Sequence, residues 1–594
     1  MKENLPSWDL RAFYKNINDP KIKLDMKASL ILAQNFAKKY RKIVNDRVLA
    51  KQLLKILREY ESIILKAIKP QLFAQLVFEA DSANHAHGAL LHQTQQSATE
   101  VGKELVFFEL ALSSLSEKKL NNLAQNSLLK NYKNYLTNQV KWKKHRLSEA
   151  EEKILADKDL TSREAFSRLF VQFLSRKQFE IKLGRKKKML NEEQVLTFLH
   201  NADRNYRKSA SVALTQGLKQ ESFLLTYIFN TLSKDKALET RLRKFKTFEE
   251  GRHLGNQIDQ KTVDVMSSAV SGSYGLVSDF YRLKKKILGL PKLYDYDRYA
   301  PTADFNQVYT YVYTKDLIIK TFGRFSKEFA KIAQEFFLKN WIDAPTRHGK
   351  RGGAFCSYGT PDTHPVVLTN FQGKLRDVQT LAHELGHGIN AYLMRKQTPI
   401  NFDNPLTLAE TASVFAEMLI FEELNRSIKD EKVRLALYMD KIENIIATVY
   451  RQIAMYKFEQ DFHALRLEKG ELRPEEINEL WRKRQKEMFG KSLELTEGYD
   501  WWWSYVPHFI ENPFYVYAYA FGELLVLSLY ARYKKDGPKF VEKYIELLSA
   551  GSSAAPEELL NPFGINLKDK KFWQEGIGYI QDLLKEAKKI AQKN

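Results

Sequence analysis

The stretch Thr380–Leu393, TLAHELGHGINAYL, carries two histidines four residues apart, with a glutamate directly after the first. On an α-helix each residue turns by about 100°, so His383 and His387 would lie on one face and could both reach a single metal ion. Glu384 would project beside that face and reach a water on the metal without being a ligand. Gly386 would keep the helix surface low, so that another element could approach. The alternative is a surface helix that carries its histidines by chance.

A catalytic zinc ion needs a third protein ligand and an open position. In PLTLAETASVFAEMLIF, Glu410 lies 27 residues after His383, which is far enough for one helix to end and another to return. Glu417 follows seven residues later on the same helical face. Acids on an apolar face are costly to bury unless they are paired or bind metal. We therefore predict Glu410 as the third ligand of one Zn²⁺ ion per chain. Glu417 would orient a zinc-bound histidine, or else be an ordinary surface acid.

Helical periodicity is lost just before this motif, in the Gly- and Pro-rich segment Asp343–Phe371. Its end, PVVLTNF, is β-branched and apolar and predicts a strand. An exposed edge of that strand could bind an extended peptide through main-chain hydrogen bonds, which makes Val367 and Leu368 candidate substrate contacts. Gly353 in GKRGGAF would let the preceding loop close over substrate, or else belong to a plain surface connector. Asp377 is the expected cap of the histidine-bearing helix.

The rest of the chain has apolar residues at spacings of three and four, which predicts helices. The expected fold class is mainly α, with one small β-sheet beside the metal-binding helix. The length of 594 residues predicts more than one lobe. We place an N-terminal helical lobe at 1–190 and a catalytic lobe at 191–594. The boundary would lie near the basic, glycine-bearing segment KLGRKKKMLNEE, Lys182–Glu193.

The net charge of +22 raises the possibility of a nucleic-acid-binding protein. However, the densest basic runs lack the interleaved aromatic residues and glycines of common RNA-binding modules, so a lysine-rich solvated surface is the preferred interpretation. The single cysteine, Cys356, excludes an intrachain disulfide. No run of about 18 apolar residues occurs, which argues against a membrane span. We therefore expect a cytoplasmic protein with no membrane partner. Nothing in the sequence bears on its oligomeric state.

Several motifs extend the pattern along the chain. The segments GKRGGAF, PVVLTNFQGKLRDVQTLAHELGHGIN, LAETASVFAE and VPHFIENPFYVYAYAFGELL follow one another in this order, after WDLRAFY and LYDYDRYAP. This series resembles the oligoendopeptidase F branch of the thimet-oligopeptidase family of zinc metallopeptidases, over most of the chain. The resemblance implies an elongated helical shell with a deep substrate channel and zinc at its floor. It also implies cleavage of short unstructured peptides.

The resemblance assigns roles to individual residues. It matches His383, His387 and Glu410 to the zinc ligands and Glu384 to the general base. It matches His508 and Tyr519 to the pair that faces the scissile carbonyl, with Tyr515 and Tyr517 as further substrate-side candidates in the same stretch. It also implies that FYVYAYA is a loop running into a helix, although its alternation alone would predict a strand. Two departures are Asn390, where many relatives have histidine, and HFIENPF, where relatives often place a tyrosine.

The predicted function is therefore a zinc-dependent metalloendopeptidase that hydrolyses internal bonds of short peptides. Two alternatives from other classes stay open at this point. One is a basic helical nucleic-acid-binding protein, which explains the charge but not the His383–Glu384–His387–Glu410 set. The other is a peptidase-like scaffold that binds peptides without cleaving them, which the intact ligands and base argue against.

Overall fold

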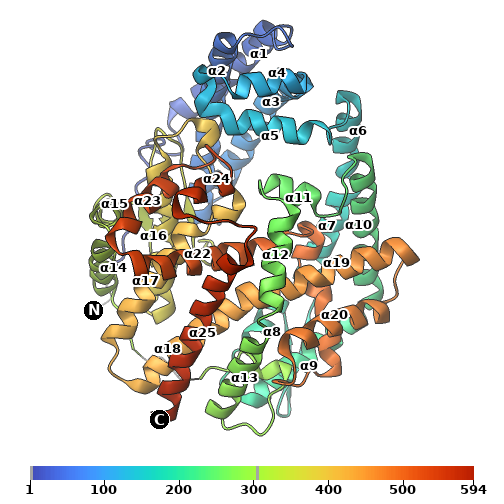
Figure 1. Ribbon diagram of the computed structural model, residues 1–594, viewed down its shortest axis with the longest axis vertical. Helices are drawn as coiled ribbons and strands as arrows, with labels where there is room; N and C mark the ends of the chain where they lie inside the picture. The colour runs from blue at the N-terminus through green and yellow to red at the C-terminus, as the bar shows by residue number, and fades with distance from the viewer. Residues whose placement is uncertain (1–3, 303–306, 594) are drawn as a thin grey trace. The chain divides into compact units, whose positions relative to one another are not determined.

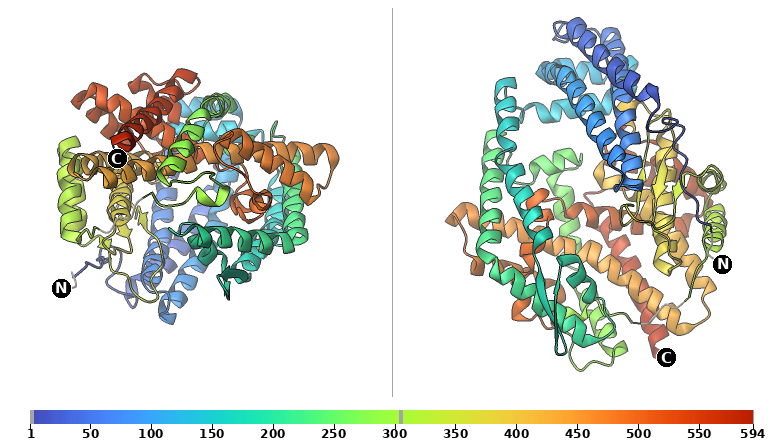
Figure 2. Two further views of the ribbon diagram at one scale, coloured as in Figure 1. Left: turned by 90° about the horizontal axis from the view of Figure 1, so that it is seen from below. Right: turned by 180° about the vertical axis from the view of Figure 1, so that it is seen from behind.

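The computed structural model describes residues 4–302 and 307–593, and most of them are helical, which confirms the mainly α fold class (Figures 1 and 2). The chain divides into two compact units, each assembled from three segments. The first unit comprises 1–144, 305–427 and 532–566, and the second comprises 145–304, 428–531 and 567–594. No helix in the described ranges combines the length and the apolarity needed to cross a membrane.

The first unit holds five N-terminal helices, a small sheet and six further helices. Its elements are α1 (Pro20–Tyr40), α2 (Ala50–Ala80), α3 (His85–Ser114), α4 (Glu117–Ala124), α5 (Lys133–Lys143), α14 (Tyr311–Phe325), α15 (Lys327–Leu338), β3 (Ile342–Asp343), β4 (Phe355–Ser357), β5 (Val366–Leu368), α16 (Leu375–Met394), α17 (Thr411–Ser427), α23 (Pro538–Ser549) and α24 (Pro556–Leu560). Helix α22 (Tyr517–Asp536) begins in the second unit and ends in this one.

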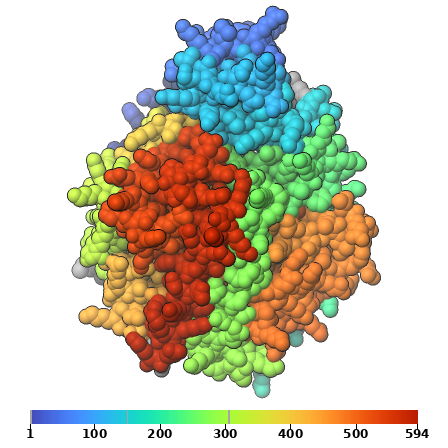
Figure 3. Space-filling view, viewed as in Figure 1, coloured from blue at the N-terminus to red at the C-terminus, as the bar shows by residue number. Residues whose placement is uncertain are grey.

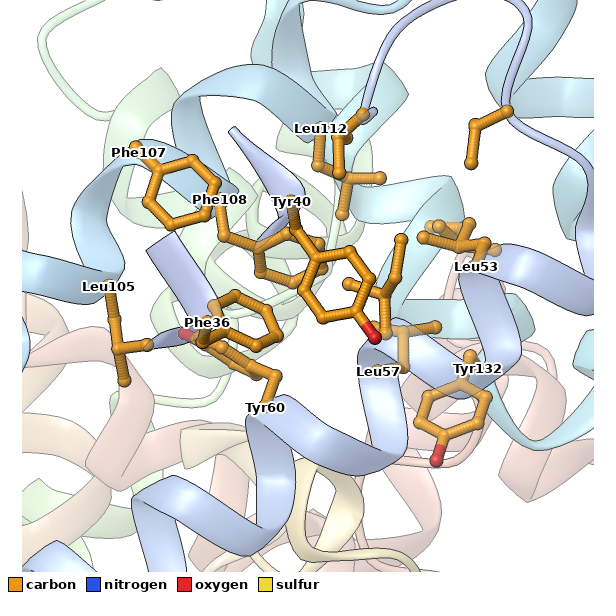
Figure 4. Packing of buried hydrophobic residues seen from close by; sticks show 14 of the residues in the cluster. Phe36, Tyr40, Leu53, Leu57, Tyr60, Leu105, Phe107, Phe108, Leu112 and Tyr132 are labelled. Atoms are coloured by element: carbon orange, nitrogen blue, oxygen red, sulfur yellow. The ribbon is translucent and has the colours of Figure 1, made fainter. Parts of the chain in front are cut away.

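Helices α1, α2 and α3 pack on one another around an aromatic core. Phe36 lies at its centre, with the rings of Tyr40, Tyr60, Phe107 and Phe108 at centroid distances of 5.0 to 6.1 Å (Figure 4). Most of these contacts are edge-to-face or tilted, which is the arrangement that aromatic quadrupoles favour. The apolar spacing of the N-terminal third therefore reflects a true helical core.

The small sheet has the strand order β3–β5–β4, with β3 parallel and β4 antiparallel to β5. It contacts α16, which confirms the prediction of a sheet beside the metal-binding helix. The predicted strand is β5, but it is the central strand, and Val367 and Leu368 are 0% exposed. The expectation of a free edge on this strand was therefore wrong, because β3 and β4 occupy both of its edges. The outer strand is β4.

Helix α16 begins at Leu375, after Lys374 in the N-cap position. Asp377 lies three residues further on, and its Oδ2 accepts the backbone N–H groups of Gln372 and Lys374 at 2.8 and 2.9 Å. The predicted role of Asp377 in satisfying the free donors at the helix start is correct. Its predicted position was not, because the carboxylate reaches back from inside the first turn.

Helix α17 packs closely along α16 at Gly386. A Cβ atom on Gly386 would lie 2.6 Å from the backbone oxygen of Ala412 and from Cα of Ser413. Only a residue without a side chain permits this approach, so the predicted reason for Gly386 is confirmed. Asn390, one turn later, is fully buried and donates to the backbone oxygen of Leu548 at 2.7 Å. Asn390 thus ties α16 to α23.

The second unit is built mainly from helices. Its elements are α6 (Glu149–Asp159), α7 (Arg163–Arg176), β1 (Phe179–Leu183), β2 (Lys186–Leu190), α8 (Glu192–Phe198), α9 (Arg204–Gln220), α10 (Ser222–Leu242), α11 (Glu250–Gly255), α12 (Gln260–Ser271), α13 (Gly275–Ile287), α18 (Glu431–Ile445), α19 (Arg451–Lys469), α20 (Pro474–Phe489), α21 (His508–Glu511), the first part of α22 and α25 (Lys570–Lys593).

A second sheet, absent from the sequence-based expectation, is the antiparallel hairpin β1–β2. It is formed by most of the segment Lys182–Glu193 that we took for a lobe boundary, and it lies within the second unit. The predicted lobes 1–190 and 191–594 follow the chain in order, whereas the compact units interleave along it. The lobe division stays a prediction, and the compact units do not coincide with it.

Helix α25 shows how the amphipathic pattern is used in this unit. Its residues Phe572, Trp573, Ile577 and Ile580 are buried at spacings of one to four. The opposite side reaches the molecular surface, where it is deep red in Figure 3. Helix α25 packs on α12, α13 and α18 of the same unit. One apolar stripe is thus enough to dock a helix of 24 residues.

Candidate active site

Three side chains converge between α16 and α17. His383 and His387 lie one turn apart on α16, and Glu410 directly precedes α17. Oε2 of Glu410 lies 3.5 Å from Nε2 of His383 and 3.3 Å from Nε2 of His387. The three ligand atoms lie within 4.8 Å of one another. Among the described residues, this is the one group of three or more histidine, cysteine, aspartate or glutamate side chains that could hold a metal ion.

These separations can be tested against a metal site. Zinc binds imidazole nitrogen and carboxylate oxygen at about 2.0–2.2 Å, so two ligands of a tetrahedral ion lie about 3.3–3.6 Å apart. The two separations from Glu410 match this value. The donor set of two imidazoles and one carboxylate also leaves one tetrahedral position open. The three residues therefore fit a catalytic metal ion.

Two further side chains hold the ligands in place. Nδ1 of His383 lies 2.6 Å from Oε1 of Glu417, which sets the ring so that Nε2 faces Glu410. The hydroxyl of Ser413 donates to Oε2 of Glu410 at 2.7 Å. Nδ1 of His387, by contrast, is buried and has no hydrogen-bond partner among the described residues. The structure thus supports the predicted role of Glu417 and adds Ser413.

The charges of the group act on one another. Burial by itself would lower the pKa of His383, but the hydrogen bond and charge of Glu417, with Glu410 and Glu384, raise it to about 9. Burial by itself would raise the pKa of Glu410, but His387, His383 and Ser413 lower it to about 2. Without a metal ion, His383 therefore holds a proton beside the carboxylates of Glu417 and Glu410. A divalent cation at Nε2 of His383 would take the place of that proton.

Glu384 is 7% exposed and directly follows His383 on α16. Its carboxylate makes no hydrogen bond to a described residue. Burial raises its pKa, while the two histidines lower it and Glu410 and Glu417 raise it further. A carboxyl group with a raised pKa and no protein partner is suited to exchange protons with water.

His508 and Tyr519 form a pair within the second unit. Nε2 of His508 lies 3.1 Å from the hydroxyl oxygen of Tyr519, and their rings meet edge to face. Burial, together with the charge of Arg451, lowers the pKa of His508 against the opposing effect of Glu511. The metal-ligand group belongs to the first unit and this pair to the second. The pairing of His508 with Tyr519 agrees with their predicted joint role, which stays a prediction.

Tyr515 and Tyr517 differ from each other. Tyr515 is half-buried and stacks on His508, with its ring 5.1 Å from that of Tyr519. Tyr517 is 0% exposed, and its hydroxyl contacts Nδ1 of His253 and Nδ2 of Asn256 at 2.9 and 2.8 Å. The structure is therefore compatible with substrate contact for Tyr515. It does not support substrate contact for Tyr517, because that side chain is enclosed by protein.

The remaining predicted substrate contacts lie near the small sheet. Val367 and Leu368 are buried in the central strand and present neither edge nor side chain to a ligand. Gly353 is exposed in the loop before β4, with φ +76° and open space where a side chain would be. Its carbonyl oxygen accepts a hydrogen bond from Asn370 at 2.8 Å. Gly353 therefore keeps its candidate role, whereas the prediction for Val367 and Leu368 was wrong.

Residues that sequence reasoning missed also lie near the group. The ring of Tyr358 stands 6.4 Å from that of His387, and the charge of Glu410 acts on its hydroxyl. Burial raises the pKa of the Cys356 thiol, and the charge of Glu384 adds to that rise. Cys356 belongs to β4 and Tyr358 directly follows it, so the outer strand approaches the metal group. The only sequence signal was their place in the segment that lost helical periodicity.

Comparison with known proteins agrees with this geometry. Residues 197–579 match the model of peptidase family M3, and residues 112–179 match the model of oligopeptidase F. An oligoendopeptidase F homolog of Borreliella burgdorferi is 29% identical over 98% of this chain and 98% of its own length. Oligopeptidase PepF of Bacillus subtilis is 28% identical over 87% of this chain and 78% of its own length.

Solved structures share the fold. A crystal structure of a candidate peptidase from Chlamydophila abortus has a TM-score of 0.88 at 24% identity and covers 98% of both chains. Oligoendopeptidase F from Enterococcus faecium has a TM-score of 0.71 at 20% identity, covering 96% of this chain and 98% of its own. The prediction of a metallo-oligopeptidase is confirmed by the family models and the relatives. The chain belongs to peptidase family M3, in its oligoendopeptidase F branch.

Proposed function

We propose that this chain is a zinc-dependent endopeptidase that hydrolyses internal bonds of short, unstructured peptides. The observation that carries the proposal is the convergence of His383, His387 and Glu410 beside the carboxylate of Glu384. Three protein ligands with an open position are typical of catalytic zinc sites, whereas structural sites use four. The group would hold one ion per chain.

The choice of zinc rests on the donor atoms. Imidazole nitrogen suits zinc and its neighbours in the first transition row, whereas Mg²⁺ and Ca²⁺ require oxygen ligands. Two of the three donors here are imidazoles. Membership of family M3 implies a metal, and the ligand separations match tetrahedral zinc.

The proposed reaction is hydrolysis with Glu384 as general base. A zinc ion bound at the group would polarise the peptide carbonyl and lower the pKa of a bound water to about 7. Glu384 accepts a proton from the water as its oxygen attacks the carbonyl carbon. The same carboxyl group then delivers that proton to the nitrogen of the leaving amine, as the C–N bond breaks. Its carboxylate is available for both steps because no described residue bonds to it.

His508 and Tyr519 would stabilise the negative charge that develops on the carbonyl oxygen. Their contact of 3.1 Å sets the direction of both side chains before substrate binds. A donor held in place in this way costs no reorganisation during the reaction. Tyr515, stacked on His508, would line the same side.

The peptide would bind along β4 (Phe355–Ser357). This strand pairs with β5 on one side only, and no described strand occupies its other edge. Main-chain hydrogen bonds along such an edge recognise any extended peptide and tolerate many side chains. Because the ring of Tyr358, directly after β4, lies 6.4 Å from that of His387, a peptide along this edge would pass the metal group.

Peptides are the partners that this chemistry requires. We further propose a cytoplasmic location, because the single Cys356 gives no intrachain disulfide, as is usual in reducing compartments. The nucleic-acid alternative rests on the net charge alone, and no contact described above favours it.

The decisive experiment is hydrolysis of an internally quenched fluorescent peptide of about ten residues. Purified protein should contain close to one zinc per chain, and a chelator should abolish cleavage until zinc is restored. Glu384→Gln should lower kcat by at least about 10²-fold while zinc content stays unchanged. Glu468→Gln, on an exposed face of α19, is the matched control and should behave as wild type.

Three outcomes would overturn the proposal or part of it. Absence of zinc from active protein would reject the metal assignment, and full activity of Glu384→Gln would reject the general base. Peptide binding without any cleavage, in the presence of bound zinc, would instead identify a scaffold that does not cleave.

A further inference from the structure

We propose that Glu459 of α19 is a positioning residue for the segment that carries His508 and Tyr519. This inference rests on the proposed function of those two residues. Glu459 would act through the backbone of Phe514, which lies between them in the chain, and it would not touch substrate.

The segment changes direction sharply between its two functional side chains. His508 begins the short helix α21, and α22 begins at Tyr517. Between the helices, Phe514 is fully buried and has φ +59°, the left-handed conformation that is unfavourable for a residue with a Cβ. A conformation of this kind persists only where the surroundings fix it.

Glu459 supplies that constraint. It is 0% exposed, and its Oε1 accepts the backbone N–H of Phe514 at 2.8 Å. Its second oxygen, Oε2, accepts no hydrogen bond from any described residue, and no described cation forms an ion pair with it. A carboxyl group buried for a single backbone hydrogen bond is a poor source of stability. The burial of Glu459 is explained if its hydrogen bond serves to hold the backbone of Phe514 in place and not to stabilise the fold.

A second anchor fixes the start of α22. The hydroxyl of Tyr517 contacts Nδ1 of His253 and Nδ2 of Asn256, and Nε2 of His253 lies 3.0 Å from Oε1 of Gln260. Helices α11 and α12 thus hold Tyr517, two residues before Tyr519. Phe514 and Tyr517, both between His508 and Tyr519 in the chain, are thus each held by a hydrogen bond from another helix or loop.

The geometry of a helix makes these two anchors important. Each residue of an α-helix turns by about 100°. A shift of α22 by one residue in its register would therefore turn Tyr519 away from His508. The contact of 3.1 Å between Nε2 of His508 and the Tyr519 hydroxyl would then be lost. Glu459 thereby controls the direction of two donors that it does not touch.

The test compares Glu459→Leu, which keeps the volume but removes the acceptor, with Glu459→Gln, which keeps an acceptor oxygen. We expect Glu459→Leu to lower kcat about 10–100-fold, with KM within threefold and zinc content unchanged. Glu459→Gln should keep kcat within about threefold of wild type. Tyr517→Phe, a milder change at the second anchor, should lower kcat in the same direction if Glu459→Leu fails to fold.

Glu61→Leu is the matched control. Glu61 is also a buried carboxyl that accepts a backbone N–H, from Ile400 at 3.1 Å, and it accepts the Tyr132 hydroxyl at 2.7 Å as well, but it lies in the other unit. We expect it to lower thermal stability without changing kcat below its unfolding temperature. Equal loss of kcat in this control would show that Glu459→Leu acts through general destabilisation and would overturn the proposal.

A double-mutant cycle separates positioning from an independent structural effect. If Glu459 acts through Tyr519, Glu459→Leu should lower kcat by less than threefold in a Tyr519→Phe background. Full additivity of the two substitutions overturns the inference while leaving the proposed function intact. Full activity of Tyr519→Phe alone would instead remove the proposed function of Tyr519 on which the inference rests.

Discussion

Nδ1 of His383 and Oε1 of Glu417 lie 2.6 Å apart, which joins α16 to α17 through a histidine that we propose as a metal ligand. The bond selects the tautomer that presents Nε2 to the ion, and it raises the basicity of the ring. In the absence of metal, the same carboxylate is a main cause of the raised pKa of His383. Glu417 therefore stabilises a proton or a metal ion on this imidazole.

Glu417→Ala should weaken zinc binding about 10–100-fold, because His383 loses the group that orients it. Glu417→Gln should weaken it less, since the amide oxygen can still accept the Nδ1 proton. Zinc affinity, measured by competition with a chromophoric chelator, checks both. Glu468→Ala, on an exposed face of α19, should leave the affinity unchanged. An unchanged affinity in Glu417→Ala would contradict the orienting role.

Gly386→Ala should disturb the metal group although it alters no ligand. The new Cβ would lie 2.6 Å from the backbone of Ala412 and Ser413, and backbone cannot move aside as a flexible side chain would. We expect a loss of about 1–3 kcal/mol in stability, from overpacking, with a fall in zinc affinity as α17 shifts with Glu410. Thermal unfolding and zinc titration measure the two effects.

The control for this prediction is Gly578→Ala in α25, where a Cβ would meet nothing within 4 Å. There the substitution should raise stability by up to about 1 kcal/mol, because alanine favours the helix. The same change in both variants would show that the approach of α17 has no bearing on Gly386.

Features set by local spacing could be predicted from the sequence, and features set by distant pairing could not. His383, Glu384, Gly386 and His387 follow from spacing on one helix, because local periodicity fixes which face each residue occupies. Glu410 lies just before α17 and was predicted from its distance along the chain and from the cost of burying an unpaired acid. The edge of the sheet did not follow, because strand order depends on the pairing of Ile342–Asp343 with a strand more than twenty residues away. Tyr517 was misjudged for a similar reason: its partners, His253 and Asn256, lie more than 260 residues earlier in the chain.

Acid should destabilise the second unit through His463. Burial, together with the charges of Lys236 and Arg466, lowers the pKa of His463 to about 3, while its ring contacts the hydroxyl of Ser233 at 3.1 Å. Because the unfolded chain takes up this proton near pH 6.5, stability is complete above that pH and is lost as the pH falls towards 3. Between pH 7 and pH 5 the loss from this residue should be about 2 kcal/mol.

His463→Phe should remove that part of the pH dependence, since its site already contacts the rings of Phe248, Phe462 and Phe514. Urea unfolding of both proteins at pH 7 and pH 5, followed by tryptophan fluorescence, gives the difference. The same fall in stability in wild type and variant would assign the acid sensitivity to other groups.

Strand addition to β4 predicts an alternating dependence on the substrate backbone. Successive N–H groups of an extended peptide point to opposite sides, so only every second one can bond to the edge of Phe355–Ser357. We expect N-methylation at single positions to weaken binding about tenfold at alternate residues and little at those between them. Affinities measured with Glu384→Gln loaded with zinc avoid cleavage during the titration. A uniform response along the peptide, or none at any position, would contradict edge binding and return the recognition of substrate to its side chains.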